Sequence, residues 1–324
     1  MSQASSMPVP GPSAIVFAYS QVGVRCLRVL LDAGVQVPLV VTHRDDPAET
    51  RWFASVAELA AEHGLACVAP DDANAPQLLA QARAAAGRPT FVFSFYYRRM
   101  LASPWLTLPA CGAFNMHGSL LPKYRGRAPV NWAVLHGERE TGATLHVMNE
   151  KPDNGAIVDQ CAVPILGDDT AREVFDKVVV AAEIVLARSL PRLVDGSARL
   201  TPQDLSKGGY FGARRPEDGR IPGDAGARQI HDLVRALAPP YPGAFVSIGA
   251  QRVFIGRTRH APAPPAAPGE RLRLCSDGAA LWLLAADGGA LRVLAARCEG
   301  ESAALDAAGF GKRFHGACMA VDAA

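Results

Sequence analysis

The chain has 324 residues, of which 49% are hydrophobic and 20% are charged. This composition is typical of a folded protein with one large domain and a smaller one, and it argues against a disordered chain. The 33 basic residues stand against 31 acidic residues, which gives a formal net charge of +2. We therefore do not expect the chain to bind nucleic acid through charge alone.

No stretch approaches the ~18 consecutive apolar residues that a membrane helix needs. Residues 1–12 lack the basic residues of a secretory signal and are expected to be flexible. The seven cysteines show no C-x-x-C spacing, which argues against a zinc site or a disulfide framework. The sequence therefore predicts a cytoplasmic protein with reduced thiols, no metal and no membrane insertion.

The first half of the chain alternates between two patterns. Short apolar runs predict buried strands, and apolar residues at helical spacing predict the helices between them. In chain order these elements are strand 14–19, helix 21–33, strand 37–42, helix 52–63, helix 76–86, strand 90–95, strand 113–116, strand 144–148 and helix 170–194. Apolar strands separated by helices indicate a mostly parallel sheet covered on both faces, as in an open α/β domain.

The pattern changes near residue 200. Ile230, Leu233, Val234 and Leu237 form one helical stripe, and short β-like runs separated by turn residues follow it. These runs are 245–248, 252–255, 272–275, 281–285 and 291–295. The sequence thus predicts a second domain, a small β-barrel or meander, joined to the first near residue 205.

Asn115 and His117 are the most informative polar residues. Because they lie two positions apart, their side chains share one face of the predicted strand, at the end where open α/β sheets bind ligands. An imidazole can take a proton from a nucleophile while an amide N–H donates to an oxygen that becomes negative. The alternative is that Asn115 caps a turn and His117 is an ordinary buried histidine.

Asp153 begins an Asp-Asn-Gly sequence that is typical of a tight hairpin turn. A carboxylate beside His117 would orient the ring and favour a raised histidine pKa. Asn115, His117 and Asp153 include no intrinsic nucleophile, so direct transfer between two bound substrates is expected rather than a covalent intermediate.

Other motifs are absent or unspecific. Ser119 lacks the second glycine of G-x-S-x-G, and neither a P-loop nor G-x-G-x-x-G occurs, so ATP and nicotinamide cofactors have no support. Basic residues gather in three places that suit either an anionic substrate or an ordinary solvated or interdomain surface. These are Lys123 with Arg125 and Arg127, Arg98 with Arg99, and Arg214 with Arg215.

The run Phe114–Pro129, with Thr141-Gly142 and Asp153–Gly155, resembles the formyltetrahydrofolate-dependent formyltransferases, which share an Asn-x-His strand and a distant Asp-x-Gly. Further segments resemble the ArnA branch, whose formyltransferase domains act on UDP-4-amino-4-deoxy-L-arabinose in lipid A modification and polymyxin resistance. These segments are Thr42–Pro47, Phe93–Arg98 and Tyr210–Gly219. The resemblance covers roughly residues 14–259. It implies a Rossmann-like domain over 1–205 and an OB-like β-barrel domain over 206–324.

The resemblance also implies roles. His117 would carry the proton of the attacking amine, Asn115 would stabilise the oxyanion, and Asp153 would raise the basicity of His117. The co-substrate would be 10-formyltetrahydrofolate, and the acceptor a UDP-amino sugar. The implied donor-binding residues are Arg99, Met100, Leu101, Arg127, Asn149, Glu150, Lys151, Pro152 and Asp153.

Several alternatives stay open. The ArnA enzymes carry a UDP-glucuronate decarboxylase domain, so either a separate decarboxylase protein serves the same pathway or this chain takes a different nucleotide sugar. Methionyl-tRNA formyltransferase shares the Asn, His and Asp residues but would need a basic face for RNA. A third hypothesis is a non-catalytic folate- or nucleotide-binding module.

Overall fold

The computed structural model describes residues 11–47, 51–262 and 271–322. The chain divides into two compact units. The first comprises residues 1–126, 142–163 and 177–210, and the second comprises 127–141, 164–176 and 211–324. Within the described ranges, no helix is both long enough and apolar enough to cross a membrane. The expected flexibility of residues 1–12 falls almost entirely outside the described residues.

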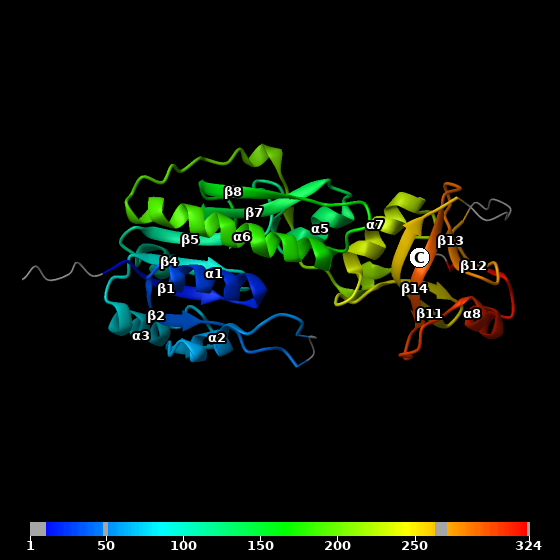
Figure 1. The fold of residues 1–324 in the computed structure, drawn as a ribbon, viewed down its shortest axis with the longest axis horizontal. Helices are drawn as coiled ribbons and strands as arrows, with labels where there is room; N and C mark the ends of the chain where they lie inside the picture. Colours follow the sequence, from blue (N-terminus) through cyan, green and yellow to red (C-terminus); the bar gives the residue numbers. More distant parts are fainter. Residues whose placement is uncertain (1–10, 48–50, 263–270, 323–324) are drawn as a thin grey trace, which may run out of the picture. The chain divides into compact units, whose positions relative to one another are not determined.

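The first unit is built on a seven-stranded sheet of order β3-β2-β1-β4-β5-β7-β8 (Figure 1). Strands β1 to β5 run parallel, and β7 pairs antiparallel with β5. The bounds are β1 Ser13–Ala18, β2 Gln36–Val41, β3 Cys67–Val68, β4 Phe91–Phe95, β5 Gly112–His117, β7 Glu140–Val147 and β8 Ile157–Pro164.

Helices cover both faces of this sheet because alternate residues of each apolar strand point to opposite sides. On one face Ile15 and Phe17 join the core formed with α3 and α4. On the other face Gly23 of α1 lies against Ala18, and Arg25 of α1 makes a paired hydrogen bond to Glu183 of α6. The bounds are α1 Ser20–Asp32, α2 Val56–Glu62, α3 Pro76–Ala86, α4 Ser103–Thr107 and α6 Ala171–Val194.

The register of the sheet brings three strand ends to one edge. Ala18 of β1 pairs with Phe95 of β4, and Phe95 pairs with Met116 of β5. The residues that follow these positions, including His117, therefore share the carboxyl edge of the sheet, where ligands bind in open α/β folds.

The second unit contains a six-stranded antiparallel sheet of order β10-β11-β14-β13-β12-β15. The sheet curls, so that the Asp322 amide, just after β15, donates to the Ser247 carbonyl of β10 across 2.9 Å. Helix α7 contributes its apolar stripe to the core of this sheet. The bounds are α7 Ala227–Leu237, β10 Ala244–Ile248, β11 Gln251–His260, β12 Arg273–Ser276, β13 Leu281–Leu284, β14 Ala290–Cys298, α8 Ala307–Phe314 and β15 Cys318–Ala320. A mostly parallel α/β sheet followed by an antiparallel half-barrel confirms the predicted fold class.

Shorter elements complete the chain, and one covalent link was not predicted. Cys275 and Cys318, paired on β12 and β15, form a disulfide, so the expectation that all thiols are reduced is wrong for this pair. Sequence spacing gave no sign of it because the two cysteines meet only through strand pairing. The remaining elements are α5 Pro129–Leu135, the small strands β6 Arg125–Gly126 and β9 Tyr210–Phe211, and the 3-10 turns Leu205–Lys207 and Pro216–Gly219.

Candidate active site

Strand β5 presents Asn115 and His117 on one face, as the alternation of strand side chains requires. Their neighbours Phe114 and Met116 are buried in the apolar core on the other face. His117 is 6% exposed, and Asn115 is half-buried. Pairing with β7 places Asn115 opposite His146 and His117 opposite Thr144.

Asp153 reaches this face from the connection between β7 and β8. Its backbone has a φ of +55°, a left-handed conformation that aspartate tolerates better than most residues. The Gly126 backbone N–H donates to Asp153 Oδ2 at 2.8 Å, and the Gln203 side-chain Nε2 donates to the Asp153 carbonyl at 3.1 Å. The Asp-Asn-Gly sequence lies in the longer connection 148–156 and not in the tight hairpin that was predicted, and this connection brings the Asp153 carboxylate to the cluster.

The two ring nitrogens of His117 have different partners. Nε2 lies 2.8 Å from the Tyr124 carbonyl, and because a carbonyl only accepts, Nε2 carries the hydrogen. Nδ1 faces Asp153 Oδ1 across 3.6 Å. In the neutral ring Nδ1 therefore holds the lone pair, and a proton added there sits beside the carboxylate.

His146 is a second histidine of the cluster that the sequence did not single out. Its Nδ1 donates to the Val147 carbonyl at 2.9 Å, which leaves Nε2 as an acceptor. Asn115 Nδ2 lies 3.1 Å from that nitrogen, and Asp153 Oδ1 lies 3.5 Å from it. His146 thus fixes the direction of the Asn115 amide. The only sequence signal for His146 was its place in the predicted strand 144–148. It comes to lie opposite Asn115 only when that strand pairs with β5.

Burial and neighbouring charges determine the pKa values of His117 and Asp153. Burial lowers the pKa of His117, and the nearby His146 lowers it further, whereas Asp153 and the Tyr124 carbonyl act in the opposite direction. The net shift is downward, so the expected raised pKa is wrong, although Asp153 does raise it in part. Burial alone would raise the pKa of Asp153, but His117, His146 and the Gly126 amide together hold it well below its usual range.

The predicted donor residues on the β4–α4 connection differ in accessibility. Arg99 is exposed and Met100 is 52% exposed, so both side chains are available to a ligand. Leu101 is 6% exposed and belongs to the core beneath the sheet. Little of Leu101 is therefore accessible to a ligand. The Met100 carbonyl accepts from Asn74 Nδ2 at 3.0 Å, which fixes this connection.

The second group of predicted donor residues precedes Asp153. Asn149, Glu150 and Lys151 are exposed and Pro152 is half-buried. Asn149 Oδ1 accepts from the Lys151 amide at 3.0 Å and so shapes the connection locally. Arg127 is also exposed, and its backbone amide donates to the Phe211 carbonyl at 2.9 Å.

The three basic groups make local contacts. Arg125 Nη2 donates to the Leu205 and Gly208 carbonyls at 3.3 and 3.1 Å, and the Arg98 guanidinium lies 4.7 Å from the Tyr19 ring centre. Half-buried Arg214 lies 5.1 Å from the Trp132 ring centre. Within the described ranges, no group of three or more His, Cys, Asp or Glu side chains is arranged to hold a metal ion.

Comparison with known proteins gives two family matches and a set of related folds. An N-formyltransferase from Helicobacter canadensis, solved with folinic acid and dTDP-3-aminofucose, is 20% identical with a TM-score of 0.67, over 87% of this chain and 98% of that one. A sugar N-formyltransferase from Shewanella sp. FDAARGOS_354 is 21% identical with a TM-score of 0.60, over 79% and 98%. HypX from Aquifex aeolicus, solved with tetrahydrofolic acid, is 18% identical with a TM-score of 0.62, over 93% of this chain and 47% of that one.

These likenesses show a shared fold. The family matches are stronger, because the formyl transferase model covers residues 19–190, more than half of the chain. The model of the formyl transferase C-terminal domain covers residues 214–314. This chain therefore belongs to the formyl transferase family and is an enzyme of that class.

Proposed function

We propose that this enzyme transfers the formyl group of 10-formyltetrahydrofolate to the amine of a nucleotide-linked amino sugar. The observation that carries the proposal is the cluster of Asn115, His117 and Asp153 at the carboxyl edge of the sheet. Two structural relatives are described as an N-formyltransferase with a dTDP-amino sugar and a sugar N-formyltransferase. The finer proposal, which the ArnA-type segments support, is UDP-4-amino-4-deoxy-L-arabinose as acceptor, in lipid A modification.

The residues near the cluster fit a folate donor. The exposed Met100 side chain offers a polarisable surface to a flat ring, and exposed Arg99 offers a cation to an anionic tail. When bound, 10-formyltetrahydrofolate supplies an activated formyl carbon. We assign donor contacts to Arg99, Met100, Leu101 and residues 149–153, with Arg127 as a further contact.

His117, Asp153 and Asn115 have different roles in the proposed transfer. His117 Nδ1 is the base, because the Tyr124 carbonyl occupies Nε2, and Nδ1 takes the proton that the amine loses. The bond between the formyl carbon and the donor nitrogen breaks as the amine gains the formyl group, and the proton on Nδ1 passes to that nitrogen of the departing tetrahydrofolate. Asp153 then stabilises the protonated ring across 3.6 Å. One Asn115 N–H is held by His146, and the other faces Asp153 Oδ1 only across 3.5 Å. That long contact is readily exchanged for an oxygen that gains negative charge.

The test is a reaction of the enzyme with 10-formyltetrahydrofolate and a panel of UDP- and dTDP-linked amino sugars, read by mass spectrometry. A mass gain of one formyl group on a nucleotide sugar supports the proposal and identifies the acceptor. Formylation of methionyl-tRNA with no sugar product would overturn it. Tight donor binding with no product from any amine would instead favour a non-catalytic binding module. A separate UDP-glucuronate decarboxylase in the same pathway stays a prediction.

A further inference from the structure

We infer that a cavity at the carboxyl ends of β1 and β2 binds the ribose of the acceptor nucleotide, and that the Asp45 carboxylate accepts a hydrogen bond from the ribose 2′-hydroxyl. The inference rests on the proposed function, and it adds a specificity-determining residue to it. It makes the enzyme selective for ribonucleotide over deoxyribonucleotide sugars.

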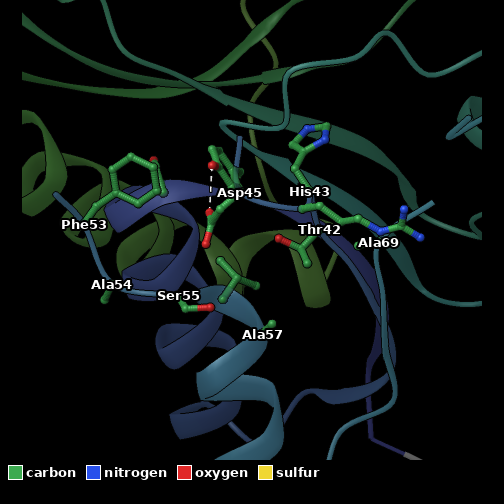
Figure 2. A pocket seen from close by; sticks show the side chains of 12 residues that line it. Thr42, His43, Asp45, Phe53, Ala54, Ser55, Ala57 and Ala69 are labelled. Carbon is green, nitrogen blue, oxygen red and sulfur yellow. Dashed lines mark hydrogen bonds between the residues drawn. The ribbon is translucent and has the colours of Figure 1, made fainter. Parts of the chain in front are cut away.

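The cavity has a volume of about 230 Å³ and combines aromatic, polar and charged side chains. It lies where β1 leads into α1 and where β2 leads toward α2. In Figure 2 the Asp45 carboxylate lies between the Phe53 ring and the strand end that carries Thr42 and His43. The lining residues are Tyr19, Ser20, Thr42, His43, Arg44, Asp45, Phe53, Ala54, Ser55, Val56, Ala57 and Ala69.

Asp45 is held in place with acceptor capacity to spare. The Tyr19 hydroxyl donates to Oδ1 at 3.0 Å, and Arg51 Nη1 donates to Oδ2 at 3.1 Å. A carboxylate has about four lone-pair sites, so with these two donors, counted over the residues that the structure describes, each oxygen keeps one for a ligand. The Asp45 side chain is 44% exposed, which leaves those sites accessible. Two adjacent hydroxyl groups of a ribose match two such sites on one carboxylate.

The same carboxylate selects the chemical class of the occupant. An ionised carboxylate only accepts hydrogen bonds, so it favours hydroxyl donors and disfavours phosphate oxygens. Next to it, the Tyr19 and Phe53 rings meet edge to face at 5.2 Å between centres. The rings supply an apolar wall against which the carbon face of a sugar can pack. A hydroxyl-rich ring therefore suits the side of this cavity that Tyr19, Asp45 and Phe53 form, whereas Arg44 lines another part of it.

The position of the cavity relative to His117 suits a nucleotide sugar. β1 is two strands away from β5, and β2 is three strands away, with their carboxyl ends in register. At ~4.8 Å between neighbouring strands, the cavity lies about 10–15 Å from His117 along the sheet edge. A sugar ring and a diphosphate span a comparable length, so the amine can reach His117 while the ribose occupies the cavity.

Open α/β folds use this place in the same way. Their ligands bind outside the carboxyl ends of the strands, where strand order reverses, and an acidic residue after the second strand binds the ribose. Here the order reverses between β1 and β4, and Asp45 follows β2 by four residues. The chain lacks the glycine-rich phosphate loop of dinucleotide-binding folds, so only the ribose contact is inferred.

The test compares the binding of uridine diphosphate and 2′-deoxyuridine diphosphate to the intact enzyme by isothermal titration calorimetry. The two probes differ only in the 2′-hydroxyl. We expect the wild-type enzyme to bind uridine diphosphate roughly tenfold more tightly, the size of one hydrogen bond to a charged group. Asp45→Asn should weaken uridine diphosphate binding by a similar factor and bring the ratio of the two affinities close to one.

Asp32→Asn is the matched control, because Asp32 is an exposed carboxylate of the same unit outside the cavity, and it should keep the wild-type ratio. Equal binding of both probes by the wild-type enzyme overturns the inference without any variant. An unchanged ratio in Asp45→Asn overturns the assignment to Asp45. Circular dichroism melting shows whether each variant is folded at the temperature of the titration.

The outcome also separates this inference from the proposed function. Equal formylation of matched UDP- and dUDP-linked amino sugars, at equal KM, would overturn the ribose contact and leave the transfer reaction standing. Selective binding of uridine diphosphate with no formyl transfer to any sugar would support the ribose contact and overturn the proposed transfer reaction.

Discussion

At the scale of single residues, the surroundings of His117 determine which of its nitrogens can do chemistry. The Tyr124 carbonyl holds the hydrogen of Nε2, and Nδ1 is left opposite Asp153. Burial keeps the ring neutral to lower pH than an exposed histidine, which is the form that a base requires. Asn115, His117 and Asp153 could be identified from the sequence as candidate site residues, since an Asn-x-His strand and an Asp-x-Gly turn stand out there. The direction of the pKa shift was not predictable, because it depends on burial.

Replacing either of the two β5 residues, Asn115 or His117, should strongly lower turnover and leave the fold intact. We expect His117→Ala and Asn115→Ala each to lower kcat by about 10² to 10⁴, because one loses the base and the other loses a donor to the developing negative charge. The measurement is steady-state formylation at saturating substrates. His63→Ala, an exposed histidine on α2's carboxyl end, should keep full activity. A His117→Ala enzyme that retains wild-type kcat contradicts the assignment.

The two neighbours of His117 should move its titration in opposite directions. Asp153 raises the pKa of His117 and His146 lowers it. Asp153→Asn should therefore shift the acid limb of the kcat/KM profile to lower pH, whereas His146→Gln should shift it to higher pH. In the wild-type enzyme the limb should lie below pH 6.5, the ordinary value for histidine. A pH–rate profile from pH 4 to 9 measures all three, and shifts of the same sign in both variants would contradict the geometry.

At the scale of elements, the long apolar strands and periodic helices were predictable, and α3 falls within the predicted bounds 76–86. Strand β8 was missed because IVDQCAVP mixes polar residues and a proline, as edge strands do. Strand β15 was missed because three residues carry too little pattern. The meeting of His146 with Asn115 could not be predicted either, because it arises from the antiparallel pairing of β5 with β7, which lie far apart in sequence.

The turn that carries Asp153 depends on Gly155. A Cβ at Gly155 would lie 1.9 Å from the Val147 carbonyl oxygen, which belongs to the backbone and cannot move aside cheaply. We expect Gly155→Ala to push the connection away from β7, displace Asp153 and lower kcat at least tenfold. Gly167→Ala is the control, since a Cβ there meets no atom within 4 Å. Equal activity of the two variants would show that the turn tolerates the shift.

At the scale of the whole molecule, the second unit contains a buried ion pair. Arg235 and Asp232 of α7 lie 2.7 Å apart with side chains 7% and 10% exposed. Arg235 also donates to the Asp169 carbonyl at 3.1 Å and so ties the segment before α6 to α7. The sequence predicted the apolar stripe of α7 but did not indicate that Arg235 and Asp232 would be buried.

The predicted boundary between the two domains near residue 205 stays a prediction.

Breaking this pair should cost the second unit much of its stability. We expect Arg235→Met to lower the free energy of unfolding by about 3 kcal/mol, because it leaves the Asp232 carboxylate buried without its main partner. Urea denaturation followed by circular dichroism measures the change. Arg228→Met is the matched control, since Arg228 is 76% exposed and lies 3.8 Å from the same aspartate. A control variant that is equally destabilised would contradict this account.

The hydrogen bond from Asp322 to Ser247 joins the last strand of the curled sheet to the first. Deleting the residues after position 317 would leave the backbone groups of β12 that face β15, and the Ser247 carbonyl of β10, without their partners, and bare edges of this kind recruit strands from other molecules. Truncated forms should therefore aggregate at concentrations where the intact chain stays in solution. For production of the protein, a purification tag is better placed at the amino end.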